Sequence, residues 1–433
     1  MIDALIVGRS LPALQTALDL AEVGLGVMIA GPAETERSAE TPERDPDGTI
    51  LTLIARAAEP LPSGESHEHP EIEPQRSLPP LPLLRDRAGA RHRQPEPNVW
   101  GIPAVPLAAD TIALLGVGGA LRAYRDRLAP LLTVGKTRSL GELARRRLGR
   151  AAHELLVEPQ LRERYGVPAE EVEVAIAAPG LNEALTRTGS LSAAALAYSD
   201  RHAQRETGVL PTAGWIRLRE VLSDRLGLYG VGSIEARVSS VQLRDDGSWR
   251  VELEDGTGIE ARALAVEGTL PWESRPAEAL LDEVRPAAVR VHAEIGIEAP
   301  EGEPETEATE IVELRSVGEW SLRSAGAGRA ELRGPRCSAD AVADPVPELD
   351  RVLQEAGIRP NPDAEWSWEL RAAPYASVDQ RKKAGAALAG LAQRQPTLLP
   401  LGRALYGDDL SAALGAAHSG AVMLRRRLLG LSD

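Results

Sequence analysis

The chain has very little cysteine, lysine and phenylalanine. Of its 433 residues, one is cysteine and none is phenylalanine, and aromatic residues make up 3%. Because Cys337 stands alone, a disulfide framework and a cysteine-rich metal site are both excluded. Pockets for flat apolar ligands usually use aromatic rings. Here the apolar content comes instead from Leu, Val, Ala and seven Trp.

Positive charge and long apolar runs are also scarce. The formal net charge is −15, and lysine occurs only at Lys136, Lys382 and Lys383. This acidic balance argues against general binding of nucleic acid or of anionic membranes. No run of about 18 apolar residues is present, so no transmembrane segment is expected. Without a signal-peptide pattern we expect a cytoplasmic protein. The seven histidines show no metal-ligand spacing, and no metal site is expected.

The start of the chain has the pattern of a strand, a helix and a second strand. We predict a buried strand at Ile2–Val7, a helix at Leu14–Val23 and a strand at Leu25–Ala30. Between the first strand and the helix lies Gly8-Arg9-Ser10-Leu11-Pro12-Ala13, where a dinucleotide-binding fold has G-x-G-x-x-G. The scaffold of a cofactor site is therefore predicted, although its motif is altered.

Each altered position has its own chemical consequence. Gly8 still permits the tight turn, and Ala13 is a tolerated substitute for the glycine that packs helix against strand. Ser10 replaces the glycine that lets backbone amides approach a pyrophosphate, and Pro12 removes one N–H donor. The acid that would hold a ribose falls at Gly31. These residues are compatible both with a cofactor site and with a packing unit that binds nothing.

The remaining chain passes from loop to helices, then to strands, and closes with a strand and a helix. Residues 34–97 are predicted as loop with one strand at Thr49–Ile54. The predicted helices are Leu107–Leu115, Leu121–Leu132, Leu140–Arg164, Ala169–Ala178, Gly180–Ala197, Trp215–Leu226, Val346–Ala356, Lys383–Gln393 and Ser411–Leu429. The predicted strands are Asn98–Pro103, Gly232–Ala236, Val238–Leu243, Trp249–Glu254, Ile259–Val266, Ala287–Ile297, Glu310–Trp320, Trp366–Leu370 and Thr397–Gly402.

Taken together, these segments resemble the flavin-containing amine oxidase superfamily, and in particular its protoporphyrinogen oxidase branch. The most specific block is Ser139–Pro159, which contains Arg145-Arg146-Arg147-Leu148-Gly149-Arg150. The other similar blocks are Gly8–Ala30, Gly214–Leu226, Val238–Gly256, Trp366–Tyr375 and Gly402–Leu410 with the helix through Gly420. The resemblance implies an α/β fold in which a Rossmann-like FAD-type domain, of the glutathione-reductase-like kind, is interleaved with an α+β substrate-type domain and a helical middle segment.

The resemblance also implies domains assembled from separate stretches of chain. Residues 1–97 are expected to begin the FAD-type domain and to carry a flexible insertion. Residues 98–212 would form a helical lobe of the substrate-type domain, and 213–275 a β meander that returns to the FAD-type domain. Residues 276–375 would form the second sheet of the substrate-type domain, and 376–433 the closing strand and helix of the FAD-type domain.

The departures from the family pattern gather at the positions that would contact the cofactor. By family position these are Gly8, Ser10, Ala13, Gly31, Val238, Gly402, Arg403, Gly407, Asp408 and Asp409. The G-G-[RK] motif expected after the second strand is absent. Arg403 stands where a polar Asn or Asp would face the pyrophosphate, and Asp408 and Asp409 stand where glycine backbone would lie against the flavin.

The two aspartates predict a conflict with a bound dinucleotide. At ~4 Å and an effective dielectric of ~20, each contact between a carboxylate and a like charge costs about 4 kcal/mol before relaxation. Arg403 either offsets this cost by pairing with phosphate or pairs with Asp408 or Asp409, and we favour the second. The triplet Arg145, Arg146 and Arg147 either meets substrate carboxylates or forms a solvated helix face, which we favour.

Two functions follow from these observations. In the first, the protein keeps the family architecture, has lost or weakened FAD binding, and is a non-catalytic binding or assembly subunit without an assigned catalytic residue. Its counterpart would be a protein partner, a second copy of the chain, or an apolar or tetrapyrrole ligand. The alternative is a divergent FAD-dependent oxidase that acts on a porphyrinogen or an amine, in which the flavin would supply the redox chemistry.

Overall fold

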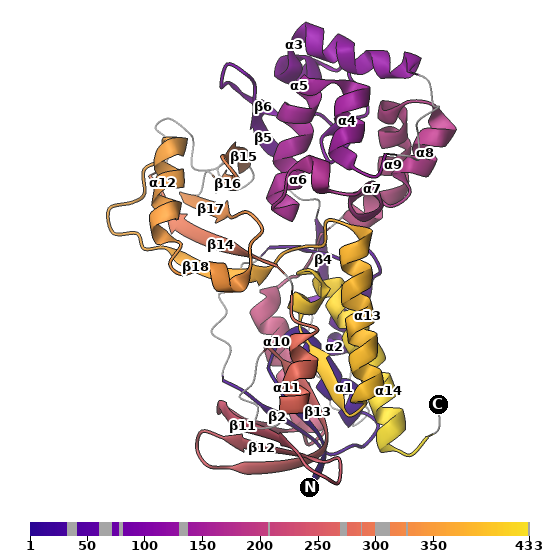
Figure 1. The fold of residues 1–433 in the computed structure, drawn as a ribbon, viewed down its shortest axis with the longest axis vertical. Coiled ribbons are helices and arrows are strands. Elements are labelled where there is room, and N and C mark those ends of the chain that lie inside the picture. Colours follow the sequence, from indigo (N-terminus) through magenta and orange to yellow (C-terminus); the bar gives the residue numbers. More distant parts are fainter. Residues whose placement is uncertain are drawn as a thin grey trace. The chain divides into compact units, whose positions relative to one another are not determined.

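The computed structural model describes the chain except for residues 33–40, 60–71, 78–80, 130–136, 207, 269–274, 287, 299–311, 326–327 and 432–433. The described chain divides into two compact units. Unit 1 consists of residues 1–79, 205–286 and 382–433, and unit 2 of residues 80–204 and 287–381. Figure 1 labels many of the helices and strands of both. None of the described helices is long and apolar enough to span a membrane.

Unit 1 is built on a mostly parallel sheet. Its strands run in the order β10-β2-β1-β13-β12-β11, and β19 pairs with β13. The pairs β10–β2, β2–β1, β1–β13 and β13–β19 are parallel, whereas β11, β12 and the first part of β13 form an antiparallel meander. The bounds are β1 Ile2–Val7, β2 Val27–Ala30, β10 Gly232–Ile234, β11 Val238–Leu243, β12 Trp249–Leu253, β13 Gly258–Glu267 and β19 Leu398–Leu401.

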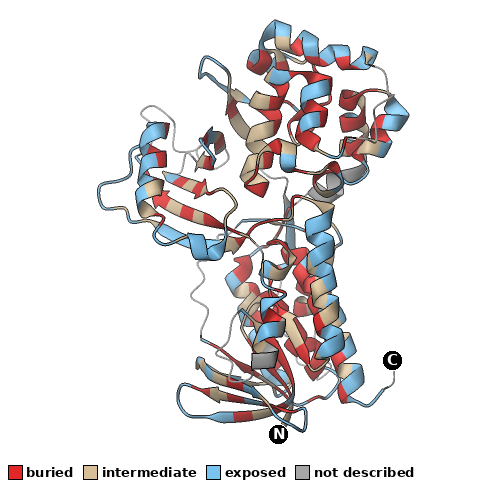
Figure 2. Cartoon of the chain, in the orientation of Figure 1, coloured by how far each residue is buried: buried red, intermediate tan, exposed pale blue. Residues whose placement is uncertain are grey.

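Alternating side chains of β1 are buried on both faces of this sheet. Ala4 and Ile6 pack in one apolar layer, and Leu5 and Val7 pack in the other. The first layer is completed by helices of unit 1, and the whole length of α1 is buried in it. These helices are α1 Leu11–Ala21, α2 Thr49–Ala58, α10 Gly214–Leu228 and α14 Leu410–Leu428. The second layer includes residues of α11 Arg275–Asp282 and α13 Val378–Arg394. In Figure 2 the central strands are largely buried, whereas β11 is mostly intermediate or exposed and the outward helix faces are exposed.

The predicted strand at Thr49–Ile54 is wrong, because this segment begins helix α2. The buried residues of α2 are Ile50, Leu53, Ile54 and Ala57, a spacing that places them on one helix face. A short apolar run of this kind fits a strand or a buried helix equally well. The Asp45 carboxylate decides for the helix, since it accepts hydrogen bonds from the N–H groups of Ile50 (3.1 Å) and Leu51 (2.9 Å).

Unit 2 combines a helical lobe with a second sheet. The sheet order is β18-β14-β17-β16-β15-β5-β6, and α12 Val346–Ala356 packs in its apolar layer. Its strands are β5 Pro82–Arg85, β6 Arg91–Arg93, β14 Val289–Gly296, β15 Val312–Val317, β16 Trp320–Ala325, β17 Arg329–Arg333 and β18 Ser367–Ala372. The lobe contains α3 Ala109–Tyr124, η2 Arg125–Leu128, α4 Leu140–Leu148, α5 Arg150–Ala152, η3 His153–Val157, α6 Glu158–Tyr165, η4 Ala169–Glu171, α7 Val174–Ala177, α8 Leu181–Thr188 and α9 Leu191–Glu206.

Several predicted elements of unit 2 are divided. The predicted helix Leu140–Arg164 breaks at Gly149, whose φ of +97° is left-handed, and passes through the π-helical turn η3. The predicted strand Glu310–Trp320 contains β15 and ends at the first residue of β16, its hairpin partner, whereas the rest of β16 and β17 were not predicted. Some predicted residues lie outside the described chain, including 310–311 of that strand, 130–132 of a predicted helix, and 34–40, 60–71 and 78–80 of the predicted loop.

Arg290 on β14 joins the second sheet of unit 2 to helix α6. Its guanidinium donates to the carbonyls of Gly334 (2.7 Å), Glu163 (2.8 Å) and Arg164 (3.1 Å). The last two carbonyls belong to the final turn of α6, where backbone acceptors lack helical partners and favour a cation. Burial, and then the nearby charge of Arg333, lower the pKa of this guanidinium to about 9, although Glu163 opposes the fall.

Replacing Arg290 with alanine is expected to destabilise the protein. The substitution leaves buried carbonyls without a donor and removes a buried cation, for which a loss of about 3 kcal/mol is typical. Chemical unfolding followed by circular dichroism measures the loss. The matched control is Arg371→Ala on β18, whose backbone lies opposite Arg290 but whose side chain bonds only an exposed Glu369 among the contacts described. Equal stabilities for the two variants would contradict this assignment.

Glu163 predicts an acid-sensitive step in stability. Burial raises the pKa of this carboxyl, but Arg333, Arg323 and Arg290 outweigh it and lower the pKa to about 2. Because the folded pKa lies below the unfolded value, the stabilisation is present above about pH 4.5 and is lost as the pH falls toward 2. Unfolding curves from pH 7 to pH 3 should show Glu163→Gln less stable than wild type at pH 7, with the difference narrowing on acidification. If the stabilities of wild type and Glu163→Gln differed by the same amount at every pH, this expectation would be wrong.

Candidate functional site

Three neighbouring parallel strands of unit 1 end together at one edge of the sheet. Val7 of β1 pairs with Val266 of β13, and Glu267 of β13 pairs with Leu401 of β19. The residues at or just beyond these ends are therefore Gly8, Glu267 and Gly402. The carboxyl ends of parallel strands are where open α/β sheets bind ligands. This edge is the candidate site.

The carboxylate of Glu267 lies at the N-terminus of α1. The Ser10 N–H donates to Glu267 Oε2 at 3.3 Å. A Cβ built on Gly8 would lie 2.6 Å from Oε2, and one built on Gly402 would lie 3.3 Å from Oε1. Glu267 thus reaches between the two glycines to the helix end, where backbone N–H groups and the helix dipole favour an anion. Sequence analysis missed this residue, because nothing in the sequence marks a strand-ending glutamate as the neighbour of Gly8.

The turn after β1 is held further by Arg9. Arg9 Nε donates to the Gly31 carbonyl (3.2 Å), and its Nη2 donates to Ser233 Oγ (2.8 Å) and to the Ile234 carbonyl (3.2 Å). These bonds tie the turn to the ends of β2 and β10. Ser10 caps α1 by its backbone position alone, and its buried Oγ has no hydrogen-bond partner among the described residues.

Arg403, which follows β19, pairs with carboxylates of the chain itself. Its Nε lies 2.6 Å from Asp408 Oδ1, and its Nη1 lies 2.8 Å from Glu43 Oε1 in β3 Glu43–Arg44. Burial favours the neutral guanidine, but Glu43 and Asp408 outweigh it and hold the pKa of Arg403 above its usual value. Sequence analysis left two alternatives for Arg403, a phosphate or an aspartate of its own chain, and the pairing with Asp408 is the one that we favoured. The contact with Glu43 was not predicted.

The other predicted positions have structural roles of their own. Asp409 caps α14, its Oδ1 accepting from Ala412 N–H at 3.0 Å. Gly407 and Asp408 both have positive φ, at +67° and +59°, and Asp408 is the rarer case because it has a side chain. Ala13 is fully buried in α1. Val238 begins β11 and packs in the apolar layer that contains Met28 and Ile234, at a different place in the sheet order from β1, β13 and β19.

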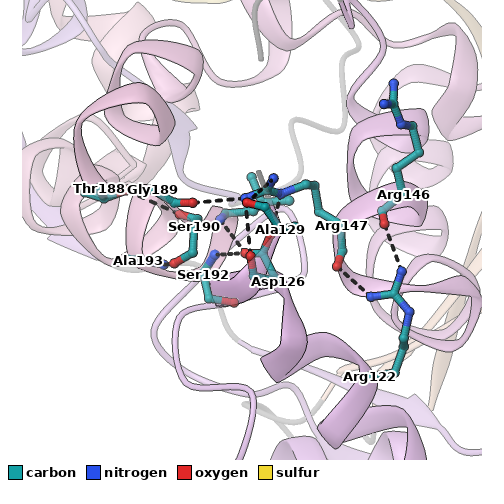
Figure 3. Close-up of polar contacts among 11 residues, drawn as sticks. Arg122, Asp126, Ala129, Arg146, Arg147, Thr188, Gly189, Ser190, Ser192 and Ala193 are labelled. Carbon is teal, nitrogen blue, oxygen red and sulfur yellow. Dashed lines mark hydrogen bonds and ion pairs between the residues drawn. The ribbon is translucent and has the colours of Figure 1, made fainter. Parts of the chain in front are cut away.

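Of the arginine triplet of α4, Arg145 and Arg146 are exposed as we favoured, but Arg147 is not. Arg147 is buried and forms an ion pair with buried Asp126, and its Nη2 donates to the Gly189 carbonyl at 3.0 Å (Figure 3). Asp126 Oδ2 in turn accepts from the N–H groups of Leu191 (2.5 Å) and Ser192 (3.3 Å) at the start of α9. The pair holds three helical segments of the lobe together. A single sequence does not distinguish such a buried arginine from its exposed neighbours.

Comparisons with known proteins find similar folds but no similar sequence. No family model and no curated protein matches the chain. Among solved structures, a protein assigned as a protoporphyrinogen oxidase from Exiguobacterium sp. 255-15 aligns with a TM-score of 0.65 and 16% identity, covering 98% of this chain and 99% of that one. Cyclohexylamine oxidase from Brevibacterium oxydans IH-35A aligns with a TM-score of 0.52 and 13% identity, covering 99% of each chain. The predicted fold class is confirmed, and the structural neighbours are oxidases of the predicted kind.

Removing the Arg403 side-chain charge should destabilise unit 1. In Arg403→Gln the carboxylates of Glu43 and the nearly buried Asp408 lose their cation, and a loss of about 2 kcal/mol is expected for charged hydrogen bonds of this kind. The double variant Arg403→Gln, Asp408→Asn should lose less than the sum of its two single variants, as measured by urea unfolding. Strictly additive losses would mean that the two side chains are not coupled.

Proposed function

We propose that this protein keeps the architecture of the flavin-containing amine oxidases but has lost tight FAD binding, and that it acts as a non-catalytic binding or assembly protein. The observation that carries this proposal is the Glu267 carboxylate at the N-terminus of α1. In a dinucleotide-binding fold this end of the helix receives the pyrophosphate. Here the carboxylate of Glu267 accepts a hydrogen bond from the Ser10 N–H at this end of the helix.

The residues of this edge do not fit a pyrophosphate. Ser10 N–H already donates to Glu267 at 3.3 Å, so a phosphate oxygen would have to displace the carboxylate. If both anions stayed within ~4 Å of each other, the repulsion would be about 4 kcal/mol at an effective dielectric of ~20. A penalty of that size corresponds to about a thousandfold in affinity. We therefore derive no reaction step through a flavin.

Arg403 does not supply the missing positive charge. Its guanidinium already contacts Asp408 and Glu43, and a phosphate would have to compete with both carboxylates. Arg9, the other cation near the turn, donates to the Gly31 and Ile234 carbonyls. Both arginines near the expected pyrophosphate position thus hold the protein's own acceptors, which supports a structural role for this edge.

Without a bound redox group, the fold could still bind another molecule, and the proposed binding or assembly role is of this kind. The counterpart would be a second protein, a second copy of this chain, or an apolar or tetrapyrrole ligand. A divergent FAD-dependent oxidase is the second candidate. It is favoured by the turn glycines, because Gly8 and Gly402 keep positive φ values of +130° and +107° at the strand ends, as close approach of a ligand would need.

Flavin binding separates these two functions. The purified full chain is expected to be colourless after gel filtration and to bind added FAD weakly, whereas Glu267→Gln should bind FAD at least about tenfold more tightly because a negative charge is removed. Flavin fluorescence quenching measures both affinities. The matched control is Glu260→Gln on the same strand, whose carboxylate is exposed and pairs with Arg244 at 2.6 Å.

Each result decides one part of the proposal. Stoichiometric FAD retained by wild type would overturn the loss of flavin and favour the oxidase. An unchanged affinity in Glu267→Gln, or an equal gain in Glu260→Gln, would show that Glu267 does not exclude the pyrophosphate.

A further inference from the structure

The turn between α5 and α6 in unit 2 has a π-helical register. The Glu158 N–H donates to the carbonyl of His153, five residues earlier. In an α-helix, residues five apart are about 140° apart around the axis, since 3.6 residues make a turn. The wider π turn brings His153 and Glu158 onto the same side instead. Such turns are rare and occur frequently at functional sites.

A second carboxylate reaches the same place from a neighbouring segment. Glu170 lies in η4, whose Ala169 N–H donates to Glu158 Oε2 at 2.8 Å. Helix α4 leaves room for η4 only because residue 141 is glycine, since a Cβ there would lie 2.4 Å from the Ala169 carbonyl carbon. One ligand atom from each of His153, Glu158 and Glu170 then lies within 4.8 Å of the others.

The imidazole of His153 is buried and aimed at this cluster. Its side chain is 8% exposed, and Nε2 lies 3.3 Å from Glu170 Oε1. Despite this short separation, Nε2 has no hydrogen-bond partner within the described part of the chain. Leaving a buried polar nitrogen unsatisfied is unfavourable and calls for an explanation, such as an ion that is not represented.

We propose that His153 Nε2, one oxygen of Glu158 and one oxygen of Glu170 bind a divalent transition-metal ion, with Zn²⁺ as the best-fitting probe. One imidazole nitrogen with carboxylate oxygens is a ligand set for zinc and its first-row neighbours, whereas magnesium and calcium prefer oxygen alone. Ligand distances of about 2.0–2.2 Å place ligand atoms about 3.5 Å apart around a tetrahedral ion. Small side-chain rotations would bring the present cluster to that size.

The bound ion would cross-link the α5–α6 turn to η4 and leave a fourth coordination position for water or a ligand. Two carboxylates balance its charge. Arg162 Nε donates to Glu158 Oε1 at 2.7 Å, and Arg145 Nη1 lies 3.5 Å from Glu170 Oε1. The first contact is a hydrogen bond of the kind that orients ligating carboxylates, and the second is an ion pair. The competing explanation is that these two arginines alone neutralise the acids and that no metal binds.

Sequence analysis predicted no metal site, because metal ligands on a helix are sought at spacings of three or four residues. In the π turn, residues five apart in sequence lie on the same face of the helix. Glu170 then comes from a separate segment.

Isothermal titration of the tag-free, EDTA-treated full chain with Zn²⁺ tests the proposal. We expect one saturable site, and a loss of at least about tenfold in affinity in His153→Gln and in Glu170→Gln. The matched controls are His92→Gln and His418→Gln, since each of these histidines lies 3.0 Å from a single aspartate, Asp86 or Asp19. The controls should bind Zn²⁺ as wild type does.

A second readout protects the test against misfolded variants. Co²⁺ bound by a histidine and carboxylates absorbs visible light, so wild type should gain bands that Glu170→Gln weakens while its circular dichroism is unchanged. No saturable binding of Zn²⁺ or Co²⁺, or equal affinity in wild type and both cluster variants, would overturn the proposal. Neither readout involves flavin, so the result is independent of the function proposed for unit 1.

Discussion

The N-terminal N–H groups of α1 require hydrogen-bond acceptors, and an anion is favoured there. Several residues of the candidate site are placed by this requirement. The helix is buried along its whole length, so its N-terminal N–H groups must be satisfied at the sheet edge. Glu267 supplies an acceptor there because β13 lies next to β1 in parallel and ends one residue beyond the Val7–Val266 pair. Gly8 and Gly402 provide the space that its side chain crosses.

In both units, arginine side chains pair with carboxylates of the same chain. Arg403 lies between Glu43 and Asp408 in unit 1, while Arg147 pairs with Asp126 in unit 2. In each case a charged group that could have met a ligand is held by the chain. A buried ion pair contributes little net stability, but removing one partner is costly. Such pairs therefore fix the arrangement of their segments, and they support our proposal that the site edge of unit 1 is structural.

The sequence located many of the elements and several of their partners. Short apolar runs placed β1 and β2 closely, and α12 was predicted with its observed bounds. We expected Arg403 to pair with Asp408 or Asp409 from the altered family motif, and it pairs with Asp408. The failures have different causes, a local contact in the first case and a long-range contact in the second. Thr49–Ile54 is helical where the Asp45 carboxylate accepts a hydrogen bond from the Ile50 N–H. Arg147 is buried where it pairs with Asp126, which also accepts a hydrogen bond from Leu191 at the start of α9.

The sequence by itself determined the class of fold, because hydrophobic periodicity and the order of strands and helices depend on neighbouring residues. It also showed where residues 8–13 differ from the G-x-G-x-x-G pattern. Only the tertiary structure decided which side chains lie beside those residues. Glu267 is 257 residues from Ser10 along the chain, and His153, Glu158 and Glu170 converge only through a π turn and a close backbone approach at Gly141. Contacts of this kind are set by strand register and helix packing, which local sequence patterns do not encode.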